Sequence, residues 1–392
     1  MLNTAFSPWP NYTDEEIDAV AATLRSNRVN QWTGEHVRSF ENEFALWCGT
    51  DQAVAVANGT LALDLALKAL NIGAGDEVIV TPRTFMASVS SVVTAGATPV
   101  FADVDPDSGT ISARTVAPCI SSKTKAILPV HLAGWPVDIA AIRTLTGGKN
   151  IAIIEDCAQA HGARVRNEPV GGLGDIGAWS FCQDKIMTTG GEGGMVTCSN
   201  PNYWERMWSY KDHGKSWDAM FNRTHAPGFR WVHENIGTNW RMLEMQAVIG
   251  RIQLKRMAAW TQRRTAIAHQ IHAALQPFAN TIRSPLPSSE YVHAFYRFYA
   301  YVRPSGLRSG WDRDRIVAEF SKLGVPLFQG SCSEVYLERA FDDTAIRPAQ
   351  RLPVARELGE TSLMFLTHPT LTDDEVEKTC DVINWVMSEA CG

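Results

Sequence analysis

The stretch WSFCQDKIMTTGGEGG, residues 179–194, holds one lysine inside a glycine-rich connection between two short apolar runs. The first run reads GAWSF (177–181) and the second reads GMVTC (194–198). Runs of this kind predict β-strands, so Lys185 is expected in a tight loop between strands and not on a solvated helix face. An amine buried beside a cationic or electrophilic cofactor loses proton affinity and becomes a nucleophile. Lys185 is therefore a candidate catalytic residue, with a plain hairpin connection as the alternative.

Similar apolar runs recur along the first half of the chain, with helix-like segments such as residues 60–70 and 85–95 between them. Strands that alternate with helices predict a mostly parallel sheet covered on both faces. The near-continuous apolar character of the runs fits strands that are buried on both sides. The sequence predicts an α/β fold with a mostly parallel seven-stranded sheet built from residues 53–57, 77–81, 99–104, 125–130, 151–155, 177–181 and 194–198.

The pattern changes in the last third of the chain. Residues 241–275 form a long helical pattern whose apolar positions share one face. An aromatic, alternating stretch at residues 293–303 follows, and then helices that include a terminal one capped by Thr372. We therefore predict a large α/β domain at residues 1–255 and a smaller α+β domain at residues 256–392, bridged by the long helix.

Composition excludes several classes of protein. The 392 residues are 45% hydrophobic and 20% charged, with a formal net charge of −6, which fits a globular chain and not a disordered one. No long basic run is present, so we expect no nucleic-acid or anionic-membrane partner. No apolar run is long enough to span a membrane, no secretory signal precedes the chain, and the eight cysteines are scattered, which predicts a cytoplasmic protein with reduced thiols. No zinc-type spacing occurs either, so we expect no metal.

Two further polar groups follow predicted strands, at the end where a parallel sheet forms its ligand crevice. Asn58, Gly59 and Thr60 follow the first run and open a helix, where free N–H groups and a glycine suit a phosphate. Asp156 follows another run, and with Gln159 it can hold a ring nitrogen and an oxyanion of the same ligand. Taken alone, the first group resembles an ordinary helix cap and the second a turn.

One cofactor needs all of these groups. Pyridoxal 5′-phosphate requires an amine for a Schiff base, a carboxylate on its pyridine nitrogen, a phosphate cup and a side chain stacked on its ring. Lys185, Asp156, Thr60 with Ser180, and Phe85 supply these groups in turn. All four features occur in the correct order along the chain. Their combination favours this cofactor over the alternative that each one is an ordinary helix cap or turn.

Further motifs surround these candidates: QWTG (31–34), NGTLAL (58–63), GDEVIVTPRTFMAS (75–88), EDCAQAHG (155–162), SFCQDKIMTTGGEGG (180–194) and GTNWRMLEMQAVIG (237–250). With them the chain resembles, over nearly its whole length, the fold-type-I sugar aminotransferases of the DegT/StrS family, which use pyridoxal phosphate. The resemblance implies that Lys185 binds the cofactor covalently, Asp156 holds its ring nitrogen and Gln159 lies against its ring hydroxyl. It also implies a role for Phe85 on the ring face, and for Gly59, Thr60 and Ser180 at the phosphate. Asn239, which we expect to open the long helix, matches the residue that reaches the phosphate from the neighbouring subunit, which implies a homodimer with shared active sites.

One segment departs from the family pattern. Residues 211–233 are longer, more aromatic and more basic than the resemblance predicts. The matching region in relatives lies close to the sugar or its phosphates, so His213, Lys215, Arg223 and Arg230 are candidate acceptor-binding residues. The alternative is that they are solvated loop charges.

The predicted reaction moves an amino group from L-glutamate onto a keto or aldehyde carbon of a sugar, with a nucleotide-linked keto sugar as the default acceptor. Alternatives are a free cyclitol ketone or an aminobenzoate precursor as acceptor, a pyridoxamine-dependent sugar dehydratase, and a non-catalytic regulator. The dehydratases carry histidine in place of the family lysine, so Lys185 argues against that reaction. The intact set of Lys185, Asp156 and Gln159 argues against a regulator.

Overall fold

The predicted runs form one sheet with the strand order β1-β9-β8-β5-β4-β2-β3 in the computed structural model, which describes residues 5–342 and 344–391. Neighbouring strands from β3 to β8 are parallel, whereas β9 is antiparallel to both β1 and β8. The strands are β1 (Gln52–Val56), β2 (Glu77–Val80), β3 (Thr98–Phe101), β4 (Thr124–Leu128), β5 (Ala152–Asp156), β8 (Ile176–Ser180) and β9 (Gly194–Cys198). The predicted α/β fold with a mostly parallel seven-stranded sheet is confirmed.

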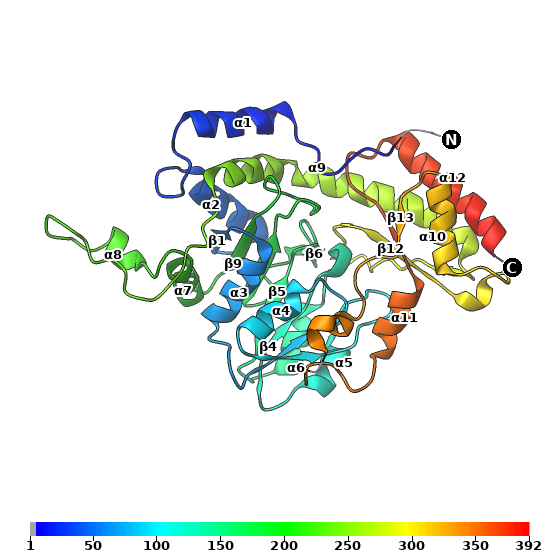
Figure 1. The fold of residues 1–392 in the computed structure, drawn as a ribbon, viewed down its shortest axis with the longest axis horizontal. Helices are drawn as coiled ribbons and strands as arrows, with labels where there is room; N and C mark the ends of the chain where they lie inside the picture. Colours follow the sequence, from blue (N-terminus) through cyan, green and yellow to red (C-terminus); the bar gives the residue numbers. More distant parts are fainter. Residues whose placement is uncertain (1–4, 343, 392) are drawn as a thin grey trace.

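Helices cover this sheet and continue into the C-terminal part (Figure 1). The α-helices are α1 (Asp14–Arg25), α2 (His36–Cys48), α3 (Gly59–Ala69), α4 (Ala87–Thr94), α5 (Ala113–Val116), α6 (Ile139–Thr146), α7 (Pro201–Lys211), α8 (Trp217–Phe221), α9 (Glu244–Leu275), α10 (Arg313–Lys322), α11 (Pro353–Thr361) and α12 (Asp373–Ala390). The short 3₁₀ helices are η1 (Ala117–Cys119), η2 (Leu132–Gly134), η3 (Gln276–Phe278), η4 (Pro304–Gly306), η5 (Val335–Leu337) and η6 (Arg339–Phe341). None of the helices within the described ranges is long and apolar enough to cross a membrane.

The two faces of the sheet have different helical covers because side chains alternate along a strand. In β1, Val54 and Val56 belong to a buried cluster with α3 and α7, whereas Ala53 and Ala55 belong to one with α2 and α9. All four side chains are nearly or fully buried. This two-sided burial explains why the strand is apolar from Ala53 to Val56 and why its carboxyl end, next to Asn58, is fixed in place.

Two smaller antiparallel sheets accompany the large one: the first lies in the C-terminal part, and the second joins two short strands of the first half of the chain to one strand of the C-terminal part. One has the order β10-β12-β14-β13, and another has the order β11-β6-β7. These strands are β6 (Arg164–Val165), β7 (Glu168–Pro169), β10 (Ile282–Arg283), β11 (Tyr291–Val292), β12 (Phe298–Val302), β13 (Leu327–Phe328) and β14 (Ser362–Phe365). Helix α9 contributes Leu254 to the core beside the large sheet and Ile267 and Ile271 to the core around β12, β14 and α12. The division at residues 255 and 256 stays a prediction.

The long helix starts later than the sequence predicts. Helix α9 begins at Glu244, whereas the apolar spacing predicts a start at Arg241. The intervening backbone is held in an extended form, since Arg241 bridges to Val56 and the Trp240 carbonyl accepts from Ala57 N at 2.9 Å. Asn239 therefore does not lie at a helix N-terminus, and the prediction that it opens this helix is wrong.

Candidate active site

Lys185 lies in the loop between β8 and β9, with its side chain 15% exposed. Its Nζ lies 3.6 Å from Asp184 Oδ1 and 5.3 Å from the centre of the Tyr296 ring. Its backbone carbonyl accepts a hydrogen bond from Trp9 Nε1 at 2.8 Å. Segments from the N-terminus, the large sheet and the C-terminal part thus meet at one amine.

Asp156 is the last residue of β5 and is buried. Its Oδ2 accepts from Ser88 Oγ at 2.7 Å, and its Oδ1 accepts from Ala158 N at 3.1 Å. Burial raises the pKa of the Asp156 carboxyl, and these two hydrogen bonds and the charge of Lys185 oppose that rise. The carboxylate is held in a fixed orientation, and an additional cationic partner would stabilise its charged form.

Gln159 is oriented by the backbone of the turn at η2. Its Oε1 accepts from Ala133 N at 2.7 Å, and Ala133 adopts the left-handed conformation with φ 56°. This bond turns the carbonyl oxygen toward the backbone and leaves the Nε2 group available to donate to a ligand. Such a donor suits a phenolate oxygen, which matches the role that the family resemblance implies.

Gly59 and Thr60 form the first turn of α3, and Asn58 caps this helix by accepting from Leu61 N at 3.0 Å. Ser180, at the end of β8, packs directly against that turn. A Cβ added to Gly59 would lie 2.5 Å from the Ser180 Cβ, so only glycine allows this approach. The Ser180 hydroxyl and the free N–H groups of a helix start are thereby placed side by side, which suits a phosphate.

Two predicted cofactor residues are open to solvent in a single chain. The Phe85 ring is 70% exposed, although it lies three residues before Ser88, which holds Asp156. Asn239 is exposed in an extended segment that bridges to Asp212. The other predicted cofactor residues are gathered at the carboxyl ends of β1, β5 and β8, with Lys185 in the connection that follows β8.

Residues 10–384 match the model of the DegT/DnrJ/EryC1/StrS aminotransferase family. The chain belongs to this family. The predictions of an aminotransferase enzyme and of this family's fold are therefore confirmed.

Individual relatives cover nearly the whole chain. The aminotransferase from Psychrobacter cryohalolentis, a solved structure, is 57% identical, has a TM-score of 0.97 and covers 98% of this chain and 99% of that one. The dTDP-3-amino-3,4,6-trideoxy-alpha-D-glucose transaminase of Streptomyces venezuelae is 39% identical over 365 residues, which is 93% of this chain and 90% of that protein. A Streptococcus pneumoniae chain assigned as a sugar aminotransferase and solved in its PLP form is 25% identical, with a TM-score of 0.86 and 99% coverage of both chains.

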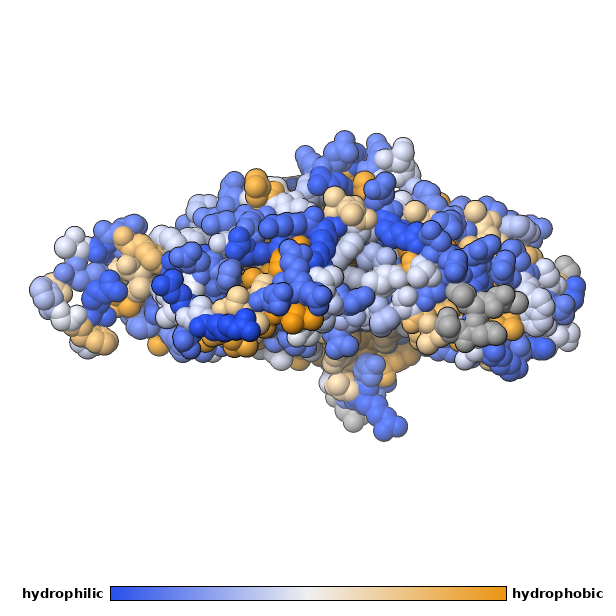
Figure 2. Space-filling view, turned by 90° about the horizontal axis from the view of Figure 1, so that it is seen from above, coloured by the Kyte–Doolittle hydropathy of each residue, from blue (hydrophilic) through white to orange (hydrophobic). Residues whose placement is uncertain are grey.

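In this aminotransferase, nearly all of residues 211–233, the segment singled out in the sequence, lies in an arm formed by residues 212–237. The arm carries α8 and projects from the side of the body in Figure 1; Figure 2 shows it at the same end, with apolar and polar atoms mixed. Phe229, Trp231 and Ile236 on it are 78%, 84% and 91% exposed. Three large apolar side chains of the arm are therefore open to solvent in a single chain.

A buried polar network fixes the base of the arm. The Lys211 ammonium group is fully buried and donates to Gln31 Oε1 at 2.9 Å and Glu41 Oε1 at 3.4 Å. The next residue, Asp212, accepts from Trp32 Nε1 and Arg241 Nη1 at 2.8 and 2.7 Å. Sequence analysis missed this network, because its members are separated along the chain and lack a common spacing.

The four candidate acceptor residues differ in whether a carboxylate of the protein already pairs with their side chains. Lys215 donates to the buried Asp212 at 2.8 Å, and Arg223 pairs with Asp218 at 2.6 Å and with Glu234. His213 and Arg230 are exposed, and neither forms an ion pair with any residue that the structure describes. Arg230 therefore keeps a free charge for a ligand, whereas the arm itself already neutralises Lys215 and Arg223.

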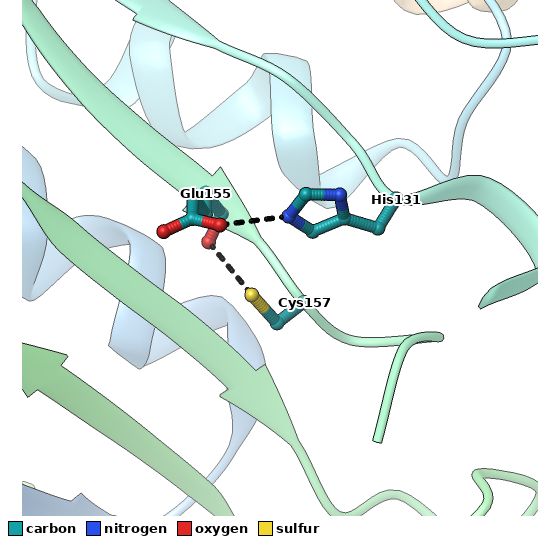
Figure 3. A group of neighbouring side chains, drawn as sticks. All are labelled: His131, Glu155 and Cys157. Carbon is teal, nitrogen blue, oxygen red and sulfur yellow. Dashed lines mark hydrogen bonds and ion pairs between the residues drawn. The ribbon is translucent and has the colours of Figure 1, made fainter. Parts of the chain in front are cut away.

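A histidine, a carboxylate and a thiol meet beneath the site and could be mistaken for a metal centre (Figure 3). His131 Nδ1 accepts from Val137 N at 2.9 Å, so its Nε2 carries the proton and donates to Glu155 Oε2 at 3.0 Å. The same Glu155 oxygen accepts from Gly171 N at 2.9 Å, and the Cys157 thiol points to the Glu155 carbonyl oxygen. These hydrogen bonds occupy the ligand atoms, which is typical of a structural core cluster.

Proposed function

We propose that this aminotransferase uses pyridoxal 5′-phosphate and transfers the amino group of L-glutamate to the carbonyl carbon of a nucleotide-linked keto sugar. The observation that carries the proposal is the convergence of the Lys185 amine, the buried Asp156 carboxylate and the Gly59–Ser180 cradle at one edge of the sheet. When bound, pyridoxal phosphate supplies an electron-accepting ring that lets the α-carbon of an amino acid lose its proton.

The chain's own groups would hold that cofactor in one orientation. The Gly59 and Thr60 N–H groups with the Ser180 hydroxyl would bind its phosphate, and Asp156 would accept from its ring nitrogen and keep that nitrogen protonated. Gln159 Nε2 would donate to its ring oxygen, and Phe85 would pack on the ring face. The donors and acceptors in this set match the groups of the cofactor one by one.

Lys185 has two tasks in this account. Its Nζ would hold the cofactor covalently, and once the donor's amine displaced it, the free Nζ would serve as the base that takes the proton from the donor's α-carbon. The Tyr296 ring and the Asp184 carboxylate lie next to the amine and restrict the conformations of the Lys185 side chain. A histidine side chain is shorter than lysine and cannot form an imine with the cofactor, and the dehydratases carry histidine at this position. The presence of Lys185 therefore argues against the dehydratase alternative.

The acceptor assignment rests on the relatives. The Streptomyces relative is named for a dTDP-linked amino sugar, which supports a nucleotide sugar and leaves its base and the aminated carbon open. A free cyclitol ketone remains the second candidate, because it presents the same ring carbonyl without the phosphates.

Separate half-reactions test this function. With L-glutamate, the holoenzyme is expected to release 2-oxoglutarate and to lose the visible absorbance of its bound cofactor. The amino-loaded enzyme is then offered keto-sugar nucleotides and inososes, and the products are identified by mass. Amination of the nucleotides supports the proposal, and amination of inososes alone supports the second candidate. Absence of 2-oxoglutarate from a cofactor-loaded enzyme would contradict the donor.

The arm provides an acceptor test with a matched control. Arg230→Ala is expected to raise the KM for the sugar nucleotide about 10-fold, because an exposed charge without a protein partner is free to meet a phosphate. Arg223→Ala serves as the control, since its guanidinium pairs with two carboxylates of the arm. The glutamate half-reaction should stay unchanged in both variants. Equal KM effects in the two variants would remove Arg230 from the acceptor site.

We further propose that two copies of the chain form a homodimer with shared sites. The exposed Phe85 ring and the projecting arm with Trp231 support this, because a second copy would cover both. In this arrangement Asn239 serves the phosphate of the partner, although in its own chain it lies beside Trp240, whose carbonyl pairs with the end of β1.

Mixed dimers distinguish whether Asn239 acts on the active site of its own chain or on that of the partner. Lys185→Ala and Asn239→Asp each inactivate both sites of their own homodimer. If Asn239 acts on the partner's site, a purified dimer of one chain of each kind has one wild-type site and regains about half of the activity. If Asn239 acts within its own chain, both sites of that dimer carry one defect. No recovery would therefore contradict the shared site.

A further inference from the structure

The N-terminal segment, residues 5–13, connects the C-terminal part of the chain to the loop that carries Lys185. In Figure 1 the dark-blue chain passes beside α12 and α9 before it enters α1. The Pro8 carbonyl accepts a hydrogen bond from Thr370 Oγ1 at 2.8 Å, which fixes the segment close to the start of α12. The next residue, Trp9, donates from its indole Nε1 to the Lys185 carbonyl at 2.8 Å. The segment is therefore anchored on the C-terminal part and contacts the catalytic loop directly.

The Trp9 ring is held between two other rings. Its centre lies 5.2 Å from that of Trp260 on α9, with the two planes at 85°. It lies 6.2 Å from the centre of the His368 ring, with the planes at 21°. Contacts on two elements fix the plane of the half-buried indole, and an N–H group points along that plane. The direction of the hydrogen bond to Lys185 is therefore set by packing around Trp9.

The loop around Lys185 depends on such contacts for its position. Lys185 lies outside the strands, so no sheet pairing holds its main chain. Further along the loop, Gly191 has a φ of 120°, a conformation that is open mainly to glycine. Thr188 N donates to Gln253 Oε1 on α9 at 2.9 Å, which anchors the loop three residues after Lys185. The indole of Trp9 supplies the anchor at Lys185 itself.

The anchor at Thr188 also leads back to the N-terminal region. Gln253 Nε2 donates at 2.8 Å to Oε1 of Glu16, a buried residue of α1. This hydrogen bond orients the amide so that its oxygen faces Thr188 N. The N-terminal region therefore acts on the catalytic loop twice, directly through Trp9 and indirectly through Glu16.

We propose that Trp9 is a positioning residue for Lys185: its indole N–H fixes the main chain of the catalytic loop so that Nζ reaches the cofactor. This rests on the proposed function and extends it. Nζ has to hold the cofactor and later act as a base, so the main chain must keep it within reach in both roles. Displacing a catalytic group by about 1 Å can cost about 10²-fold in rate. Because Trp9 acts through Lys185, its loss should lower kcat more than it raises KM.

The glutamate half-reaction tests this role. Trp9→Phe keeps an aromatic ring between Trp260 and His368 but removes the N–H donor. We expect kcat to fall about 10-fold and the KM for L-glutamate to change less than about threefold. Trp260→Phe is the matched control, because it alters a ring that contacts Trp9 and leaves the hydrogen bond to Lys185 in place. Its kcat should stay within about twofold of wild type. Equal losses of kcat in the two variants would indicate a general packing role and overturn the proposal.

Hydrogen exchange gives a readout without catalysis. In the purified full-length protein, amide exchange in residues 182–190 should be at least about threefold faster in Trp9→Phe and unchanged in Trp260→Phe. Thr370→Val, which removes the anchor of Pro8, should give a smaller increase. Unchanged exchange in Trp9→Phe, or in Thr370→Val where Trp9→Phe does not fold, overturns the proposal. If the wild type consumes no glutamate, the proposed donor reaction fails, and exchange still decides whether Trp9 holds the loop.

Discussion

Lys185→Ala is expected to abolish amino transfer, with a loss of turnover of at least ~10³-fold. The reason is that the variant removes both the amine that binds the cofactor covalently and the base that moves the proton. Cofactor binding should persist without a covalent bond, through the cradle at Gly59 and Ser180 and through Asp156. Turnover is measured as release of 2-oxoglutarate, and retained cofactor is measured after gel filtration.

Two variants separate the chemistry of this amine from its charge. Lys185→Arg keeps a cation beside Asp184 and the Tyr296 ring but offers no amine of suitable reactivity, so it should be as inactive as Lys185→Ala. Lys68→Ala, whose ammonium group lies over the Tyr210 ring, is a lysine control and should leave turnover unchanged. Turnover within about 10-fold of wild type in Lys185→Ala would mean that another group carries the reaction.

Asp156→Asn is expected to slow turnover about 10²-fold, or roughly 3 kcal/mol on the barrier. The amide keeps the shape of the carboxylate but removes the charge that keeps the ring nitrogen protonated, so the ring accepts electrons less well. Cofactor loss should be modest, because the phosphate contacts are intact. The measurement is single-turnover kinetics with L-glutamate, together with the cofactor's absorbance spectrum.

Ser88→Ala is a milder change at the same site and serves as the comparison for Asp156→Asn. It removes the 2.7 Å hydrogen bond to Asp156 Oδ2 and leaves the carboxylate, so its effect should stay below about 10-fold. Thermal unfolding of both variants checks that the buried pair still folds. Near-wild-type turnover in Asp156→Asn would show that the ring nitrogen is held by another group.

The large sheet could be predicted from the sequence because its strands are buried on both faces. In β1, for example, Val54 and Ala55 belong to cores on opposite sides, so residues 53–56 are all apolar and the strand is easy to recognise. The smaller sheets could not be predicted in this way. Strands β6 and β7 have two residues each, too few to show any alternation.

The clustering of the candidate cofactor residues could also be predicted, because most of them lie within a few residues of a strand end, where local sequence is informative. The base of the arm could not. Lys211 and Glu41 are brought together only by tertiary packing. The late start of α9 has the same origin, since pairing of Arg241 with Val56 overrides the helical spacing of residues 241–243.

Mapping the cofactor's attachment site in the wild-type protein tests the central claim most directly. Purified holoenzyme is reduced with borohydride, which makes the bond between cofactor and lysine permanent, and its peptides are then analysed by mass spectrometry. The account predicts that the peptide with Lys185, in the sequence SFCQDKIMTTGGEGG, carries the reduced cofactor. A reduced adduct on a different lysine, or cofactor that binds but is never fixed by reduction, would contradict it.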